Sequence, residues 1–220
     1  MAYVDFVSKI HQSTSRDYLQ RVIEHDKAAC ADVATQWGKD YWDGERHFGY
    51  GGFNYDGRWR PVAEAMVKHY ELPNDARILD VGCGKGFLLY EFTQVLPGAR
   101  VAGIDISEYG IKHAKPEIQS NLRVGSARSL PYDSDSIDLV ISINTLHNLR
   151  NFELWDALSE LNRVARGSKY LTVESYRTER EKVNLLYWQL TCRSFYAVDE
   201  WEWIFDQTGY DGDYSFIFFE

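Results

Sequence analysis

The middle of the chain alternates between short apolar runs and segments whose apolar residues recur at every third or fourth position. The short runs predict strands at Arg77 to Val81, Val101 to Asp105, Leu122 to Val124, Leu139 to Ile143, Lys169 to Glu174 and Ser215 to Phe219. The periodic segments predict helices at Gly86 to Leu96, Tyr109 to Lys115, Phe152 to Ala165, Lys182 to Thr191 and Val198 to Gln207. Strands that alternate with helices of about ten residues require parallel crossover connections. The pattern therefore predicts a doubly wound α/β fold with a mainly parallel sheet and helices on both faces.

The first 60 residues follow a different pattern. Apolar residues at intervals of three and four predict one amphipathic helix from Ser15 to Trp37. From Asp40 to Arg60, five glycines alternate with aromatic and charged residues, which predicts an ordered loop. Pro61 then suits the first turn of the next helix. We therefore divide the chain into an N-terminal helix with a glycine-rich aromatic lid at 1–60, and a single globular ligand-binding unit at 61–220.

A glycine-rich loop, ILDVGCGKGF at 78–87, joins the first predicted strand to the next helix. Glycines allow backbone angles closed to other residues and let a ligand approach the main chain, and the helix that follows offers unpaired N–H groups. A phosphate-binding P-loop would need Ser or Thr after Lys85, where Gly86 stands. A dinucleotide-binding loop would need glycine at the position of Phe87. The loop therefore excludes the P-loop class and disfavours the dinucleotide-binding class.

Composition and charge narrow the ligand further. The net charge of -9 repels polyanions on average, so a small-molecule substrate is favoured over nucleic acid. The three cysteines are far apart, without the paired spacing of a zinc site or a disulfide framework, which indicates a reducing compartment and no metal. No segment approaches the roughly 18 apolar residues that span a bilayer. We expect a soluble cytoplasmic protein without a membrane partner.

Four motifs in order carry a resemblance to a known family. The sequence D-x-G-x-G-x-G at 80–86 is similar to motif I of the class I S-adenosylmethionine-dependent methyltransferases. The strand at 101–105 ends in an acid, as the second motif does, and 124–131 with its following strand is similar to the family's G-D-A-x-x-L-P pattern. The fourth motif, at 142–149, occupies the place where the family often has a strand that ends in Leu-His-His. The resemblance covers about Arg77 to Glu174.

The resemblance implies S-adenosylmethionine as the cofactor, S-adenosylhomocysteine as its product and a Rossmann-like fold. By this resemblance the glycine loop would bind the methionine end of the cofactor, and Asp105 would bind the ribose diol. The third motif would face the adenine, and it has Ser126 in place of the family's aspartate. The lid would offer Tyr50 to the cofactor carboxylate, whereas Lys85 is expected to be solvated. The predicted cofactor-binding residues are Tyr50, Asp80, Gly82, Cys83, Gly84, Gly86, Asp105, Ile106, Ser126, Ala127 and Asn144.

Catalysis would be in-line displacement at the methyl carbon, with an oxygen or nitrogen of the acceptor as the nucleophile. For a hydroxyl acceptor, His147 is the first candidate base and Glu174 the second; an amine acceptor needs neither. Arg177 could bind a carboxylate or phosphate of the substrate together with Tyr176 and Tyr187, or else form a salt bridge on the surface.

The resemblance leaves the acceptor open. We expect a small polar metabolite, with a lean to the hydroxyl of a sugar or nucleotide sugar. The alternatives are a catalytically silent regulator or scaffold that binds S-adenosylmethionine, and an RNA methyltransferase. The family's sheet has seven strands and ends in an antiparallel hairpin, but only one final strand is clear here, so six strands are the alternative. An unpaired edge could then form a homodimer.

Overall fold

A single parallel sheet organises the molecule in the computed structural model, which describes residues 1–12 and 17–220. The described strands form a six-stranded sheet in the order β3-β2-β1-β4-β5-β6, and all pairings are parallel. The strands are β1 (Arg77–Val81), β2 (Arg100–Asp105), β3 (Leu122–Val124), β4 (Ile137–Ile143), β5 (Ala165–Glu174) and β6 (Asp213–Ile217). This confirms the predicted α/β fold, with six strands rather than seven.

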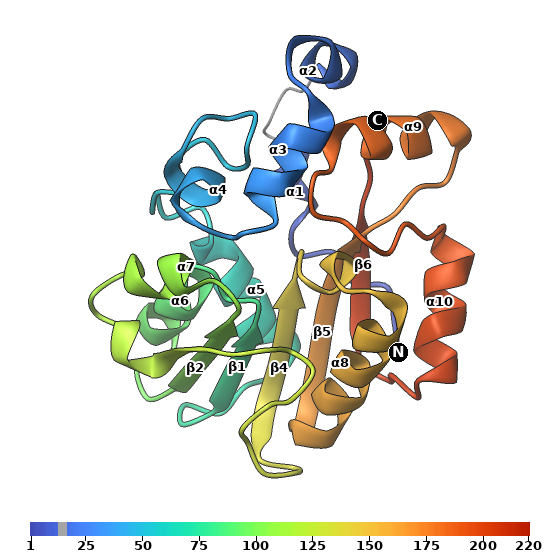
Figure 1. Cartoon of the computed structure of the whole chain (residues 1–220). Helices are drawn as coiled ribbons and strands as arrows, with labels where there is room; N and C mark the ends of the chain where they lie inside the picture. Colours follow the sequence, from blue (N-terminus) through green and yellow to red (C-terminus); the bar gives the residue numbers. More distant parts are fainter. Residues whose placement is uncertain (13–16) are drawn as a thin grey trace.

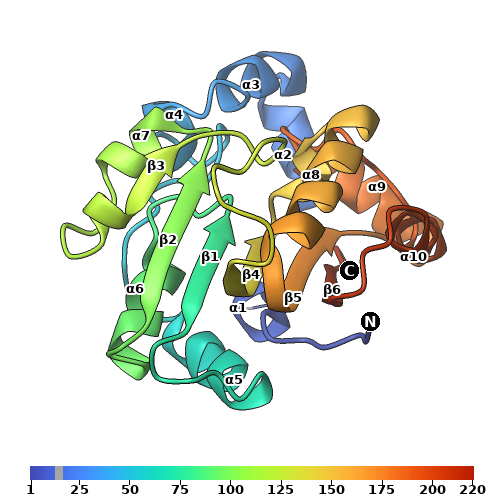
Figure 2. The same cartoon turned by 90° about the horizontal axis from the view of Figure 1, so that it is seen from below.

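Helices cover both faces of the sheet, as the apolar strands predicted (Figure 2). On one face lie α5 (Arg60–His69) and α6 (Phe87–Val95), which bury Met66, Leu89 and Phe92. On the other lie α8 (Asn151–Val164) and α10 (Val198–Gln207), which bury Leu158 and Trp201. Their three- and four-residue apolar spacing turns one stripe of each helix toward the strands. The other elements after α5 are α7 (Glu108–Lys112), η1 (Gln119–Asn121), η2 (Leu146–Asn148) and α9 (Glu179–Trp188).

The sheet ends at β6, which pairs parallel with β5 because α9 and α10 carry the chain back across the sheet. The outer edge of β6 is partly covered by the chain's own first residues. The Val4 N–H donates to the Tyr214 carbonyl at 2.9 Å, and the Tyr214 N–H donates to the Ala2 carbonyl at 3.0 Å. Figure 2 shows the N-terminus beside β6. The expected unpaired edge is therefore occupied where Tyr214 lies.

The prediction of a single helix from Ser15 to Trp37 was wrong. The described part of that segment forms α2 (Tyr18–Glu24) and α3 (Lys27–Ala34), with extended backbone at His25. The side chain of Asp26 accepts a hydrogen bond from the Ala29 N–H at 2.9 Å and so caps a new helix. The predicted helix start at Ser15 lies outside the described residues. An N-cap in mid-segment ends one helix and begins another even though the apolar spacing continues.

The N-terminal elements sit over the end of the sheet where ligands bind in such folds. Figure 1 shows α1 (Ser8–Gln12), α2, α3 and α4 (Lys39–Asp43) gathered with α9 beyond the tip of β4. The predicted loop at 40–60, called the lid segment below, thus begins as a short helix. In an open parallel sheet the ligand crevice lies at the carboxyl ends of the strands. Among the described residues, no helix is long and apolar enough to cross a membrane.

Candidate functional site

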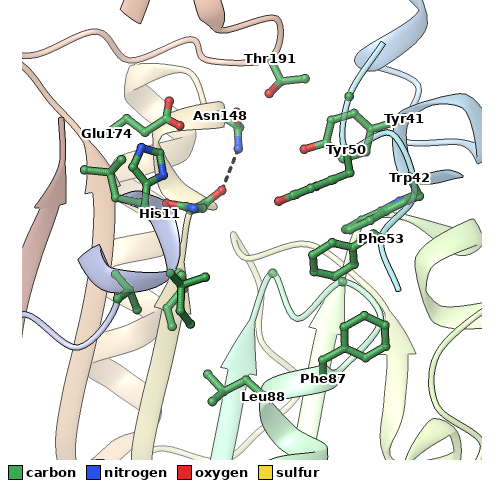
Figure 3. A pocket seen from close by; sticks show the side chains of 18 of the residues that line it. His11, Tyr41, Trp42, Tyr50, Phe53, Phe87, Leu88, Asn148, Glu174 and Thr191 are labelled. Carbon is green, nitrogen blue, oxygen red and sulfur yellow. Dashed lines mark hydrogen bonds between the residues drawn. The ribbon is translucent and has the colours of Figure 1, made fainter. Parts of the chain in front are cut away.

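A cavity of about 460 Å³ lies at the carboxyl ends of β1, β4 and β5. Figure 3 shows Glu174, His11 and Asn148 on one side of this cavity, and the lid aromatics on the other. Thr191 borders it between the two sides. The cavity brings together eight of the predicted site residues: Tyr50, Asp80, Gly82, Cys83, Gly84, Asn144, His147 and Glu174.

The glycine loop has the backbone that its sequence predicts. Gly82, Gly84 and Gly86 have φ angles of 88°, 54° and 70°, in the left-handed region that favours glycine. A Cβ atom on Gly82 would lie 1.8 Å from the Thr145 Oγ1 atom, and one on Gly84 would lie 2.7 Å from the Trp42 ring. The first two glycines are therefore required by close packing as well as by backbone angle. Gly86 precedes α6 and does not line the cavity.

The acid at the end of β2 is bound to the loop itself. Asp105 is only 8% exposed; its Oδ2 accepts the Gly84 N–H at 2.7 Å and its Oδ1 accepts the Ser107 N–H at 2.8 Å. Burial raises the pKa of Asp105, and the two backbone hydrogen bonds act in the opposite direction. In this conformation Asp105 holds the glycine loop against β2 and is not part of the cavity lining.

Trp42 of α4 fills the space between the glycine loop and the start of α7. Its ring lies against Gly84 and Gly110, and its Nε1–H donates to the Ser107 Oγ at 2.8 Å. The residues predicted to contact ribose and adenine are therefore not brought to the cavity. Of these, the Ile106 side chain is exposed, the Ser126 Oγ accepts the Arg128 N–H, and Ala127 packs in the core. Their contacts with the cofactor stay predictions.

The lid segment is fastened to the loop by a buried ion pair. The Lys85 ammonium lies 2.7 and 2.8 Å from the two carboxylate oxygens of Asp43 and donates to the Phe53 carbonyl at 2.8 Å. The Tyr109 hydroxyl donates to the same carboxylate at 2.9 Å. Burial acts to raise the pKa of Asp43, but these hydrogen bonds outweigh it and lower the pKa. The expectation of a solvated Lys85 was wrong, because the side chain is 4% exposed.

Aromatic rings of the lid segment form one wall of the cavity. Tyr50 stacks on Trp42 with ring centroids 5.3 Å apart, and Phe53 stacks on Phe87 of α6 at 5.0 Å. Figure 3 shows the Tyr50 and Tyr41 hydroxyls directed toward the side that carries Asn148 and Glu174. An aromatic wall of this kind excludes water and attracts cations through the ring faces.

Three buried oxygen acceptors line the cavity without a hydrogen-bond partner in the described part of the chain. They are Oδ1 of Asp80, Asn144 and Asn148. Burial, together with the charge of Asp105, raises the pKa of Asp80 to about 7. Acceptors left unpaired in a buried site are destabilising unless a ligand supplies donors. The set suits a ligand that bears N–H donors and positive charge, as the methionine end of S-adenosylmethionine does.

His147 and Glu174 form a buried pair at the far side of the cavity. The backbone N–H of Glu174 donates to His147 Nδ1 at 3.3 Å, and Nε2 of the ring lies 3.5 Å from Glu174 Oε2. Burial lowers the pKa of His147 to about 3, so the ring is neutral at pH 7 and carries its proton on Nε2. The backbone N–H groups of Arg193 and Ser194 donate to the His147 carbonyl. His147 thus orients the Glu174 carboxylate and fixes the chain around it.

The predicted substrate residues lie away from the cavity. The Arg177 guanidinium forms ion pairs with Glu181 and Glu220 and lies over the Phe218 ring, so the alternative of a surface salt bridge describes its position. Tyr176 forms an isolated parallel β-bridge with Ala197 and does not line the cavity. Tyr187 is also absent from the cavity lining, although Trp188, Gln189, Leu190 and Thr191 are part of it. None of these geometries supports substrate contact by the predicted residues.

The structure adds cavity residues that the sequence did not suggest. Val7, Ile10 and His11 of the N-terminal segment line the cavity, although they lie about 70 residues before the glycine loop in sequence. Arg21 of α2 and Arg46 of the lid segment also line it. Their sequence neighbourhoods carry no motif, so only the docking of these segments onto the sheet could identify them.

Comparison with known proteins is consistent with this architecture. A family model described as a methyltransferase domain matches residues 72–209. The chain is 29% identical over 137 residues to demethylmenaquinone methyltransferase of Roseiflexus castenholzii, covering 60% of this chain and 56% of that protein. It is 32% identical over 145 residues to the tRNA (carboxymethyluridine(34)-5-O)-methyltransferase of Arabidopsis thaliana, covering 66% and 34%. The chain thus spans about half or less of these relatives.

A solved structure shows the same fold. The S-adenosylmethionine-dependent methyltransferase of Archaeoglobus fulgidus matches with a TM-score of 0.55 at 21% identity, covering 75% of this chain and 71% of that one. At this identity the likeness concerns the arrangement of strands and helices. The fold is therefore shared.

Proposed function

The chain belongs to the class I S-adenosylmethionine-dependent methyltransferase family, and on this premise we propose that it transfers the cofactor's methyl group to an oxygen or nitrogen of a small polar metabolite. One observation carries the proposal. The unpaired acceptors of Asp80 and Asn144 lie beside the glycine loop, opposite an aromatic wall, in a cavity that also holds a buried carboxylate, Glu174. Cofactor, acceptor and base can meet there.

Residues of this chain would divide the work as follows. Asp80 and Asn144 accept N–H groups of the methionine end, and Gly82 and Gly84 let it approach the backbone. Bound S-adenosylmethionine supplies the methyl group and a sulfonium leaving group. Glu174 takes the proton of an acceptor hydroxyl, while His147 holds its carboxylate in position. The lid aromatics exclude water, so that positioning provides much of the rate enhancement.

The cavity lining favours a polar acceptor. Asn148 and Glu174 provide oxygen and nitrogen atoms on the side opposite the aromatic wall, and Thr191 provides a hydroxyl between the two sides. A hydroxyl-rich ring such as a sugar or a nucleotide sugar matches this division. The relatives act on acceptors as different as demethylmenaquinone and tRNA by their names, so their likeness does not choose between acceptors.

We also propose that the protein works in the cytoplasm. All three cysteines, Cys30, Cys83 and Cys192, are buried and free, which suits the reducing cytoplasm. Burial raises the pKa of Cys83 well above that of a free thiol, so this residue contributes small size to the loop rather than a reactive thiolate.

Calorimetric titration with S-adenosylhomocysteine, with NAD in parallel, tests the cofactor. We expect micromolar binding of the first alone. Radiolabelled S-adenosylmethionine is then incubated with separate small-molecule and tRNA pools. Label in the small-molecule pool supports the proposal, whereas label in tRNA alone would reassign the acceptor. Cofactor binding without transfer to either pool would favour a silent regulator.

A further inference from the structure

Two arginines that line the cavity have no acidic partner in the described part of the chain. Arg21 and Arg46 line the cavity, and neither forms an ion pair with a carboxylate in the described ranges 1–12 and 17–220. By contrast, Arg58, which also lines it, is ion-paired with Asp56. The chain carries a net charge of -9, so uncompensated cations at a ligand cavity are a feature that needs an explanation.

The two guanidinium groups are held in place by contacts that do not neutralise them. Both lie over the Trp188 ring, with the Arg21 and Arg46 Cζ atoms 4.5 and 5.1 Å from its centroid. Arg21 donates to the Arg46 and His47 carbonyls at 3.2 and 3.1 Å, and Arg46 donates to the Gly49 carbonyl at 2.6 Å. The remaining N–H groups of both guanidiniums are available to a ligand.

The charges repel one another as they stand. Burial and the nearby Arg46 lower the pKa of Arg21, and burial together with Arg21 lowers the pKa of Lys27. Glu45, the neighbour of Arg46 in sequence, pairs with His47 through a contact of 3.3 Å and has a largely exposed side chain. A bound anion would relieve this repulsion, because charge-assisted hydrogen bonds to a planar fork are strong.

We propose that Arg21 and Arg46 form an anion-binding subsite that holds a carboxylate or phosphate group of the small-molecule acceptor. The proposal rests on the proposed methyl transfer and names its substrate class: an acceptor with an anionic group at one end and the methylated atom at the other. Both guanidinium groups lie over the ring of Trp188. The next three residues of the chain, 189–191, also line the cavity, as Glu174 does. The anion clamp expected at Arg177 is thus assigned to different residues.

Calorimetry on the full chain saturated with S-adenosylhomocysteine tests the subsite. The probes are benzoate for a carboxylate, inorganic phosphate for a phosphate, and uncharged benzamide as a control. We expect benzoate or phosphate to bind and benzamide not to bind; whichever anion binds more tightly identifies the group. Arg21→Gln and Arg46→Gln should each weaken the anion about tenfold or more, as expected for loss of hydrogen bonds to a charged group.

A matched variant separates the subsite from overall charge. Arg180→Gln removes the same charge from an exposed position of α9 outside the cavity lining and should leave anion affinity unchanged. Arg46→Lys keeps the charge but not the planar fork, and should recover part of the affinity. S-adenosylhomocysteine affinity should stay the same in all four variants, which also shows that they are folded.

Three results would overturn the subsite. The first is no binding of benzoate or phosphate to a protein that does bind S-adenosylhomocysteine. The second is a loss of S-adenosylhomocysteine affinity in Arg21→Gln and Arg46→Gln that equals their loss of anion affinity, which would mean that the arginines bind the cofactor. The third is tRNA binding that depends on both arginines while small anions do not bind. Failure of S-adenosylhomocysteine to bind the wild type would instead reject the proposed function.

Discussion

Asp80 shows how a single buried side chain can link cofactor binding to pH. Its pKa is raised to about 7, so near neutral pH it is partly protonated in the free protein. A ligand ammonium group favours the carboxylate and lowers that pKa, so binding releases a proton. Affinity must then increase as pH rises through this range.

We predict that S-adenosylhomocysteine binds several-fold more tightly at about pH 8 than at about pH 6, with a limit of about tenfold per unit below the pKa of Asp80. Calorimetry at several pH values measures this dependence. Asp80→Asn, which cannot ionise, should bind more weakly at pH 8 and with little pH dependence. An equally steep dependence in Asp80→Asn would assign the effect to another group.

The pair at the far side of the cavity leads to a second prediction for single residues. His147, with a pKa of about 3, is a weak base at neutral pH, and its Nδ1 already accepts the Glu174 N–H. Glu174→Gln should therefore lower the rate of transfer to a hydroxyl acceptor by about a hundredfold or more while cofactor affinity is kept. Single-turnover kinetics measures the rate.

His147→Gln serves as the comparison. It leaves the Glu174 N–H poorly paired and should lower the free energy of unfolding by about 1 to 3 kcal/mol, seen in urea denaturation. If Glu174→Gln were fully active and His147→Gln inactive but stable, the base would be His147 after all.

The lid segment is the element whose position controls access. Trp42 covers Gly84, and the Asp43–Lys85 pair fastens the helix that carries it. Trp42 packs on Gly84 and donates to Ser107, the two residues whose N–H groups bind Asp105. We therefore expect α4 to move before a full cofactor can reach Asp105. The strength of the ion pair should then set the rate of opening.

We predict that Asp43→Asn increases the association rate constant of S-adenosylhomocysteine about tenfold or more, because charge-assisted hydrogen bonds to Lys85 are lost. Stopped-flow tryptophan fluorescence follows the binding. Asp40→Asn, an exposed acid of the same helix, is the matched control and should bind at the wild-type rate. Identical rates in both variants would mean that this pair does not limit access.

At the scale of the whole molecule, the outer edge of β6 is the surface through which two copies of the chain could dimerise. The N-terminal residues pair with Tyr214 along this edge, in the place where a further strand would lie. Val4→Pro removes the N–H that donates to the Tyr214 carbonyl and should open the edge.

We predict a larger dimer fraction for Val4→Pro than for the wild type, measured by size exclusion with light scattering. Val4→Ala retains the donor and should behave as the wild type does. The homodimer expected from the sequence stays a prediction; a wild type that dimerises as strongly as Val4→Pro would show that another surface forms the contact.

The sequence by itself determined the parallel sheet, the flanking helices and the glycine loop. Apolar periodicity and glycine conformation are local properties, so they can be read along the chain without knowing what packs against it. Asp80, Asn144 and His147 were predicted from motifs that resemble those of the methyltransferase family, and Glu174 from its place at the end of a predicted strand. The cavity brings these four residues together.

Only the tertiary structure decided which charges are paired. Lys85 is buried because Asp43 lies against it, Arg177 is neutralised by Glu181, and Arg21 and Arg46 form no ion pair within residues 1–12 and 17–220. The sequence predicted the opposite for Lys85 and left both outcomes open for Arg177. A charged side chain looks the same in sequence whether or not a distant segment supplies its partner, and the energy of the charge depends on that partner and on burial.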